Sequence, residues 1–224
     1  MQPTKRIQIR TLGRIFGLLF LTTLLCAYPV PSRAVGIGPY VDVAGGSGTF
    51  EWDVSNSEFD VDVGTGAIGL AIDTAPTGRS GFNYRLNIGL EAQALEDDSD
   101  ITMNLGGLTV ENVFGFAVIQ QPNLRWWLGP LVRIGYYSGE TDDYYDFGDR
   151  YKTEGDFFEF GIGVATGINV RVNRNVVLAP SAGVRFIGAS GEGTIINYTT
   201  GTRETEDLTG SISTVFLNFA LLFE

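Results

Sequence analysis

The sequence predicts an all-β fold, an eight-stranded antiparallel up-and-down transmembrane β-barrel, and three observations lead there. Apolar and polar residues alternate along eight segments, as in strands that have one apolar and one polar face. No segment after residue 34 has the pattern of an amphipathic helix that could cover the apolar faces, which leaves lipid to cover them. Short turns and longer loops alternate between the segments, as in bacterial outer-membrane barrels.

Residues 1–34 are predicted to be a signal peptide that is removed. Four basic residues within the first 14 precede an apolar stretch, 15–27, that is too short for a comfortable transmembrane helix. Ser32 and Ala34 place small residues at the −3 and −1 positions of a cleavage site after Ala34. Cys26 offers an alternative lipoprotein site, but Leu25 before it is larger than such a site favours. Residues 35–224 then form the outer-membrane β-barrel.

The mature chain is strongly acidic. Five of the 15 basic residues and none of the 26 acidic ones precede residue 35, which leaves ten against 26 and a net charge of about −16. Nucleic acid is excluded as a partner because its phosphates would be repelled. The single cysteine lies in the signal peptide, so the mature chain has neither disulfides nor thiol chemistry.

The eight predicted strands differ in how regular they are. They are 36–50, 59–73, 80–96, 101–120, 124–138, 156–172, 176–189 and 210–223. In the clearest, Phe82–Ala94, every even position is apolar and every odd one is polar or glycine. The strands at 124–138 and 156–172 also alternate, with Trp126 and Phe160 among the residues expected to face lipid. The first two are less regular, and a bulge near Gly45–Gly46 would switch their phase.

The connections predict the orientation of the barrel. Short turns are expected at 73–79, 120–123 and 173–175, and longer loops at 51–58, 96–100, 139–155 and 190–209. An even strand number places both termini on the turn side, with turns in the periplasm and loops outside. Aromatic residues near strand ends are expected to form interfacial girdles; they are Trp52, Phe59, Phe82, Trp126, Tyr136, Phe158 and Phe186.

The last strand carries a resemblance to a known class. Residues Ser213–Phe223 have an apolar residue at every odd position from Val215 onward and end on an aromatic residue, with Glu224 following it. This segment is similar to the C-terminal assembly signal of the small eight-stranded outer-membrane barrels of the OmpA/OmpX type, in which the aromatic residue is normally last. The resemblance covers the mature chain. It implies a bacterial outer-membrane location, contact with outer-membrane lipid and lipopolysaccharide, and recognition by the barrel-assembly machinery.

The absence of histidine from the sequence argues against catalysis. The known outer-membrane barrel enzymes resemble one another in relying on a catalytic histidine, and serine or water needs such a base near neutral pH. Gly64–Gly69 matches GxGxxG, but no helix follows it. We expect no catalytic residue, cofactor or resident metal, and an envelope-structural or surface-interaction role. An envelope enzyme that modifies lipid without a histidine is the second alternative to this role, after the channel that is considered below.

Seven charged residues are expected to point into the lumen: Arg85, Glu91, Glu111, Arg133, Glu159, Arg171 and Arg185. An eight-stranded barrel is just wide enough for side chains to fill, and buried ions must pair or be hydrated. Glu111 and Arg133 lie equally far from the turn at 120–123, so we expect contact between them or through a shared neighbour. A polar plug is favoured; a narrow, porin-like channel is the first alternative. The inward charges argue against a soluble barrel that binds an apolar ligand.

Four aspartates crowd the loop at 139–155, among several tyrosines. They are Asp142, Asp143, Asp146 and Asp149. Hard divalent cations prefer carboxylate oxygens, and tyrosines recur at interfaces. One hypothesis is therefore a cation- or partner-binding loop. A solvated, repulsive outer surface is favoured over it, because the spacing is not that of an EF-hand.

Overall fold

A computed structural model describes residues 35–224 except 53–56, 78–79, 100 and 147. The predicted signal peptide, with Cys26, lies outside the described residues. Within the described part of the chain, no helix is long and apolar enough to cross a membrane.

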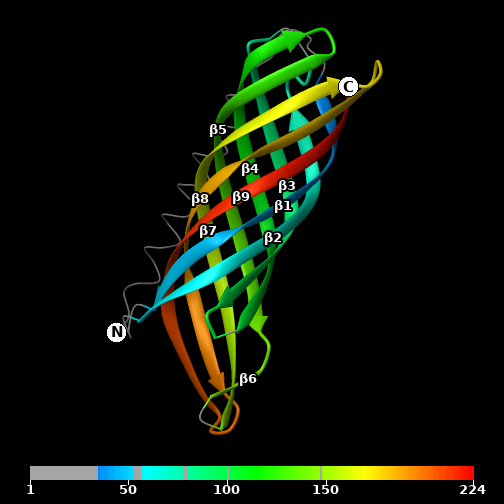
Figure 1. The fold of residues 1–224 in the computed structure, drawn as a ribbon. Coiled ribbons are helices and arrows are strands. Elements are labelled where there is room, and N and C mark those ends of the chain that lie inside the picture. Colours follow the sequence, from blue (N-terminus) through cyan, green and yellow to red (C-terminus); the bar gives the residue numbers. More distant parts are fainter. Residues whose placement is uncertain (1–34, 53–56, 78–79, 100, 147) are drawn as a thin grey trace, which may run out of the picture. The chain divides into compact units, whose positions relative to one another are not determined.

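Nine strands are present among the described residues, and eight of them form a closed ring. They are β1 (Gly36–Trp52), β2 (Ser57–Asp73), β3 (Phe82–Asp97), β4 (Thr102–Gln121), β5 (Leu124–Thr141), β6 (Tyr144–Asp146), β7 (Asp149–Arg171), β8 (Val176–Asn197) and β9 (Thr202–Phe223). Except for β5 and β6, strands that are adjacent in sequence pair antiparallel; β1 also pairs with β9, and β5 pairs with β7 (Figure 1). The short β6 pairs with β7 outside the ring. The predicted all-β, up-and-down barrel is confirmed.

Alternation along each strand separates an apolar wall from a polar lumen. On β3, Leu90 is 63% exposed, whereas Asn83 and Arg85 are fully buried. The outward faces of the other strands are also apolar. They include Val41, Val43, Ile68, Leu108, Leu128, Ile162, Val164, Val215 and Leu217, each at least 47% exposed. A belt of this extent is the surface that lipid covers on such a barrel.

The first strand keeps one phase throughout, so the bulge considered near Gly45–Gly46 is wrong. β1 pairs with β2 and with β9 without a register shift there. A Cβ at Gly46 would lie 1.9 Å from the Ser213 carbonyl oxygen, so glycine allows the two backbones to approach closely. The even positions of β1 therefore face inward, which places Tyr40 and Asp42 in the lumen. The one register shift recorded among the described residues lies between Ala117 and Ile119 of β4.

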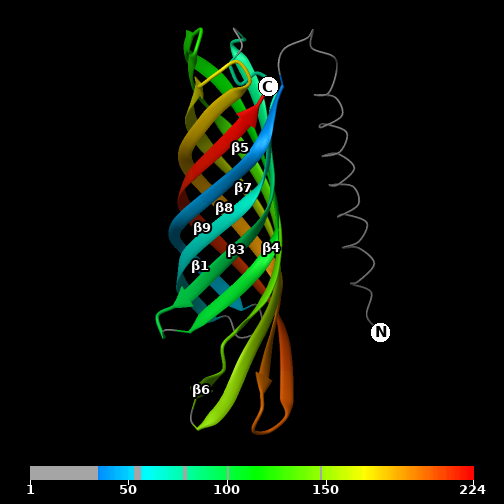
Figure 2. The ribbon, with the colours of Figure 1, turned by 90° about the vertical axis from the view of Figure 1, so that its right-hand side faces the viewer.

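The two longest predicted loops are mostly strand. β5 continues to Thr141 and β7 begins at Asp149, while β8 and β9 pair as far out as Asn197 and Thr202. Positive φ angles at Gly148 (92°) and Gly201 (74°) let the chain reverse at the tips. These outer hairpins project beyond the ring on the loop side (Figure 2). At the other end, Ile37 and Val176 both pair with Phe223, so the barrel's first and last strands meet on the turn side.

Candidate functional site

The lumen contains the charged residues that the alternation pattern pointed inward. Arg85, Glu91, Glu111, Arg133, Glu159 and Arg185 are each at most 4% exposed. Arg171 lies at the turn-side rim, with its side chain 33% exposed. Arg133 and Arg185 lie at one level with the carboxylates that they bind, whereas Arg85 lies between that level and the turn-side end. We call the level around Arg133 and Arg185 the ion network, and the level at the turn side the periplasmic plug.

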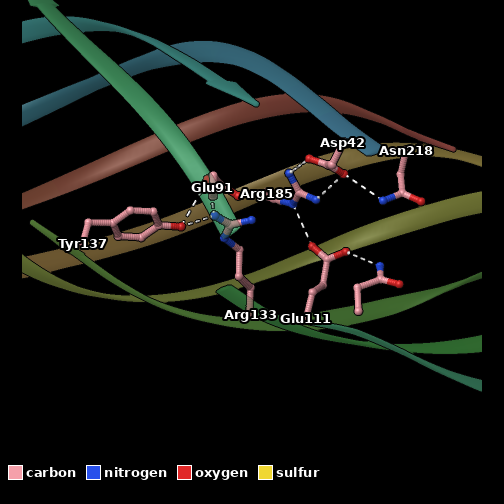
Figure 3. A network of polar contacts seen from close by, with 8 residues as sticks. Asp42, Glu91, Glu111, Arg133, Tyr137, Arg185 and Asn218 are labelled. Carbon is pink, nitrogen blue, oxygen red and sulfur yellow. Dashed lines mark hydrogen bonds and ion pairs between the residues drawn. The ribbon is translucent and has the colours of Figure 1, made fainter. Parts of the chain in front are cut away.

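Arg185 of β8 holds two carboxylates in the ion network (Figure 3). Its Nη1 and Nη2 donate to the two carboxylate oxygens of Asp42, each at 2.9 Å. Its Nε donates to Glu111 Oε2 at 2.8 Å. The guanidinium carbon lies 3.8 Å from the centre of the Phe216 ring, and Asn218 donates to Asp42 at 3.1 Å. Arg185 therefore links strands from different sides of the lumen through charge-assisted hydrogen bonds.

Arg133 of β5 forms the second half of the ion network (Figure 3). Its Nη2 donates to Glu91 Oε1 and to the Tyr137 hydroxyl, each at 2.5 Å. The Tyr137 hydroxyl donates to the same Glu91 oxygen at 3.1 Å. One carboxylate oxygen thus receives two donors from β5. Tyr137 is fully buried, so the triad has no direct contact with bulk water there.

The expected relationship between Glu111 and Arg133 is correct in register and wrong in pairing. The two residues are direct partners in the β4–β5 ladder, so they lie at the same height. The ion pairs join Glu111 to Arg185 and Arg133 to Glu91 instead. A long arginine side chain that points into a narrow lumen reaches a strand further round the ring rather than its own neighbour. The register between neighbouring strands therefore determines the height of each charged residue in the lumen, but it does not determine which residue forms an ion pair with it.

The connection between β2 and β3 folds into the turn-side end of the barrel. Ala75 is 3% exposed there. Arg125 Nη1 donates to the Ala75 carbonyl oxygen at 2.7 Å, and Asn169 Nδ2 donates to the Pro76 carbonyl oxygen at 2.7 Å. Barrel side chains thus bind this segment through its backbone. We define the periplasmic plug as residues 74–77 with the side chains that hold them.

Glu224 fastens the rim of the plug. Its Oε1 accepts a hydrogen bond from Thr77 Oγ1 at 2.7 Å, and its Oε2 lies 2.5 Å from Arg171 Nη2. Arg171 also donates to Thr77. The Glu224 side chain is 4% exposed although it follows the last strand. Glu224 therefore helps to hold the β2–β3 connection at the turn-side rim.

A buried ion pair lies directly beneath the plug. Arg85 donates through Nε and Nη2 to Asp73 Oδ2, at 3.1 and 3.0 Å. Asn83 donates to the same oxygen at 3.1 Å. Asn169 Oδ1 accepts from Arg85 at 2.9 Å and from Trp127 at 3.1 Å. These contacts fill the lumen between the plug and the ion network.

Toward the loop side the lumen becomes apolar. A buried apolar cluster lies in this part of the interior: Phe50, Val61, Val63, Leu95, Leu105, Tyr137, Phe157, Ile187, Ala189, Leu208 and Ile212. Trp52 and Phe59, expected in an interfacial girdle, pack against this cluster inside the barrel. That expectation is wrong for both, because the phase of the first two strands points them inward. Phe82, Trp126, Tyr136 and Phe186 are exposed on the outside, as expected.

Sequence reasoning missed two carboxylates of the lumen. The sequence pattern leaves the phase of the first strand open, so it does not assign Asp42 to a face, and it puts Asp73 at the boundary between a strand and a turn. Tyr40 and Asp42 are two residues apart, so their side chains lie on the same face of the strand. An inward Tyr40 would therefore place Asp42 in the lumen as well. Asp73 could be assigned only from the β2–β3 register, in which it faces Arg85.

The four aspartates of the predicted acidic loop lie on or beside the outer hairpins. Asp143 forms an ion pair with Arg150, and its hydrogen bond raises the pKa of that guanidinium. Asp149 accepts from Asn197 Nδ2 at 3.3 Å, Asp142 is exposed, and Asp146 ends β6. No three metal-ligating side chains converge anywhere in the described ranges. Cation binding at these residues stays a prediction.

Solved structures share this fold, whereas comparisons of the sequence find no related family or protein. No protein-family model and no curated protein matches the chain. The outer membrane protein OprG from Pseudomonas aeruginosa is 9% identical, with a TM-score of 0.52 over 83% of this chain and 95% of its own. A major outer membrane protein from Thermus thermophilus is 13% identical, with a TM-score of 0.46 over 85% and 100%. The outer membrane protease OmpT from Escherichia coli is 10% identical, with a TM-score of 0.34 over 86% and 99%.

The similarity to OprG and the ring of strands agree. Residues 35–224 fold as a closed antiparallel barrel, and its outer surface carries the apolar belt that lipid requires. The protein has the fold of the small bacterial outer-membrane β-barrels.

Proposed function

We propose that the protein is a non-enzymatic outer-membrane barrel with a closed lumen, which acts in envelope structure or surface interaction through its outer hairpins. The observation that carries this proposal is the double obstruction of the lumen. The ion network crosses it at one level and the periplasmic plug crosses it at another. Residues 1–34 would direct export, the barrel-assembly machinery would insert the barrel, and lipopolysaccharide would surround its outer half.

The two obstructions support a closed lumen for an energetic reason. An ion that passes the ion network must displace hydrogen bonds between Arg185, Asp42 and Glu111, all of them buried. Separating such a pair in a water-poor interior leaves charges uncompensated, at a cost of about 3–5 kcal/mol. The plug adds backbone contacts that no small ion replaces.

A non-enzymatic role is supported by the sequence and by the partners of the buried carboxylates. The chain has no histidine. Asp42, Glu91 and Glu111 each accept hydrogen bonds from arginine in the ion network, so these carboxylates already serve as partners in buried ion pairs. A histidine-free enzyme that modifies lipid would change the mass spectrum of lipid A or phospholipids in cells that overexpress the protein, whereas we expect an unchanged spectrum.

Single-channel recording in planar bilayers separates the closed barrel from a porin-like channel. We expect no conductance steps for the wild type, for the plug variant Arg171→Ala/Glu224→Ala, or for the network variant Asp42→Ala/Glu111→Ala/Arg185→Ala. No steps are expected when both sets are combined either, because Arg85, Trp127 and Asn169 still fill the lumen between the two levels. Val43→Ala on the lipid face is the control. Steps from the wild-type barrel would favour the channel instead.

A further inference from the structure

The loop-side end of the lumen contains a cavity of about 190 Å³. Aromatic and aliphatic side chains form most of its wall, including Phe50, Trp52, Phe59, Met103, Phe157 and Leu208. These residues come from five different strands of the ring. The cavity lies on the loop side of the ion network, and most of its lining belongs to one buried apolar cluster.

Three inward glycines keep the centre of this compartment open. A Cβ at Gly193 would lie 2.4 Å from the Trp52 ring, and one at Gly210 would lie 2.4 Å from the Phe50 ring. A Cβ at Gly155 would lie 2.7 Å from the Phe157 ring. The rings therefore lie against bare backbone instead of filling the lumen. Phe50 also stacks on Phe59, with ring centres 6.0 Å apart and planes 21° apart, which holds both rings in place.

The ion network adjoins the apolar cluster that surrounds the cavity, and the Asp97 carboxylate lies on the loop side of the cavity. Tyr137 belongs to the surrounding apolar cluster, and its hydroxyl bonds to Glu91 and Arg133 of the ion network. Asp97 lines the cavity on the loop side. Its Oδ1 accepts backbone hydrogen bonds from Ser99 and Ile101, each at 2.9 Å, which holds the carboxylate at the rim. Asp98 beside it is exposed.

We propose that this cavity binds a small apolar molecule, neutral or positively charged, about the size of one substituted aromatic ring. The size follows from the volume, because an apolar cavity of about 150 Å³ is large enough to hold benzene. Binding is driven by removal of the ligand from water and by contact with the surrounding rings. The charge follows from the Asp97 carboxylate in the cavity lining, which repels an anion. The inference goes beyond the proposed function and does not depend on whether the lumen conducts.

Three matched compounds test the size and the charge of the ligand. They are 4-fluorobenzyl alcohol, 4-fluorobenzylamine and 4-fluorobenzoate, which are neutral, cationic and anionic near neutral pH. Fluorine NMR line widths would be followed during titration of the barrel in lipid nanodiscs, with empty nanodiscs subtracted. We expect saturable broadening for the alcohol and the amine and none for the benzoate. Absence of saturation for the alcohol overturns the site, and equal binding of the benzoate overturns its charge selectivity.

Two leucine substitutions on β9 locate the binding site. Leu208 lines the cavity, whereas Leu217 is 63% exposed on the lipid face. Leu208→Trp should fill the cavity and remove the saturable broadening, and Leu217→Trp should retain it. Gly193→Ala, which pushes Trp52 inward, provides a second obstruction if Leu208→Trp does not fold. Resistance to SDS without heating would verify folding. Retained broadening in a folded cavity variant, or loss in Leu217→Trp, would overturn the proposal.

Discussion

Arg185 and Asp42 are joined across β9 by two parallel hydrogen bonds of 2.9 Å, from strands at opposite ends of the sequence. The same arginine also binds Glu111, so one guanidinium forms ion pairs with two buried carboxylates. The geometry makes Arg185 the residue on which the middle of the lumen depends most.

Arg185→Ala should destabilise the barrel more than removal of an exposed arginine. The change leaves Asp42 and Glu111 without their cation, and an uncompensated buried charge costs about 3–5 kcal/mol. Arg203→Ala on the outer part of β9 is the control, because Arg203 is exposed. The free energy of unfolding in urea, measured in lipid vesicles, gives both values. Equal values for the two variants would mean that water already reaches the ion network.

A double-mutant cycle should identify the partner of Arg133. Glu91 and Arg133 are in contact, so we expect a coupling energy of about 0.5–3 kcal/mol between Glu91→Ala and Arg133→Ala. The cycle between Glu111→Ala and Arg133→Ala should show weaker coupling, although these two residues are ladder partners. Urea unfolding of the single and double variants supplies both cycles. The reverse order would indicate that Arg133 turns to its neighbouring strand.

Leu217→Arg should cost about 2–4 kcal/mol, because it places a charge on the lipid face near mid-membrane. Thr205→Arg lies on the same strand beyond the apolar belt and should be close to neutral. Folding yield and urea unfolding in vesicles report the difference. A neutral Leu217→Arg would contradict a lipid contact at that position.

Epitope tags should report which end of the barrel faces outward. A tag inserted at Gly201, at the tip of the β8–β9 hairpin, should bind antibody on intact cells, because loop tips tolerate insertion. A tag at Arg174, in the short turn between β7 and β8, should bind only after the outer membrane is permeabilised. Surface labelling of the Arg174 tag alone would invert the orientation.

The outer hairpins are strands in segments where the sequence pattern predicted loops. Acidic and glycine-rich composition predicted loops at 139–155 and 190–209, yet most of these residues are strand. Their backbone groups pair with the adjacent strand, as Thr194 does with Thr205, while acidic side chains such as Asp142 and Glu204 are exposed to solvent. Composition reports the exposure of a side chain, whereas strand formation here depends on a partner that the local sequence does not reveal.

By itself, the sequence determined the strand number, the barrel class and the face of most inward residues, including Glu91, Arg133 and Arg185. Alternation along a strand is local, because consecutive side chains point to opposite sides whatever the strand pairs with. The tertiary structure alone decided that Arg185 pairs with Asp42, that Glu224 fastens Thr77, and that Trp52 borders a cavity. Each of these contacts joins residues from separate strands or connections across a closed interior. Their positions follow from ring closure and strand register, which no single segment encodes.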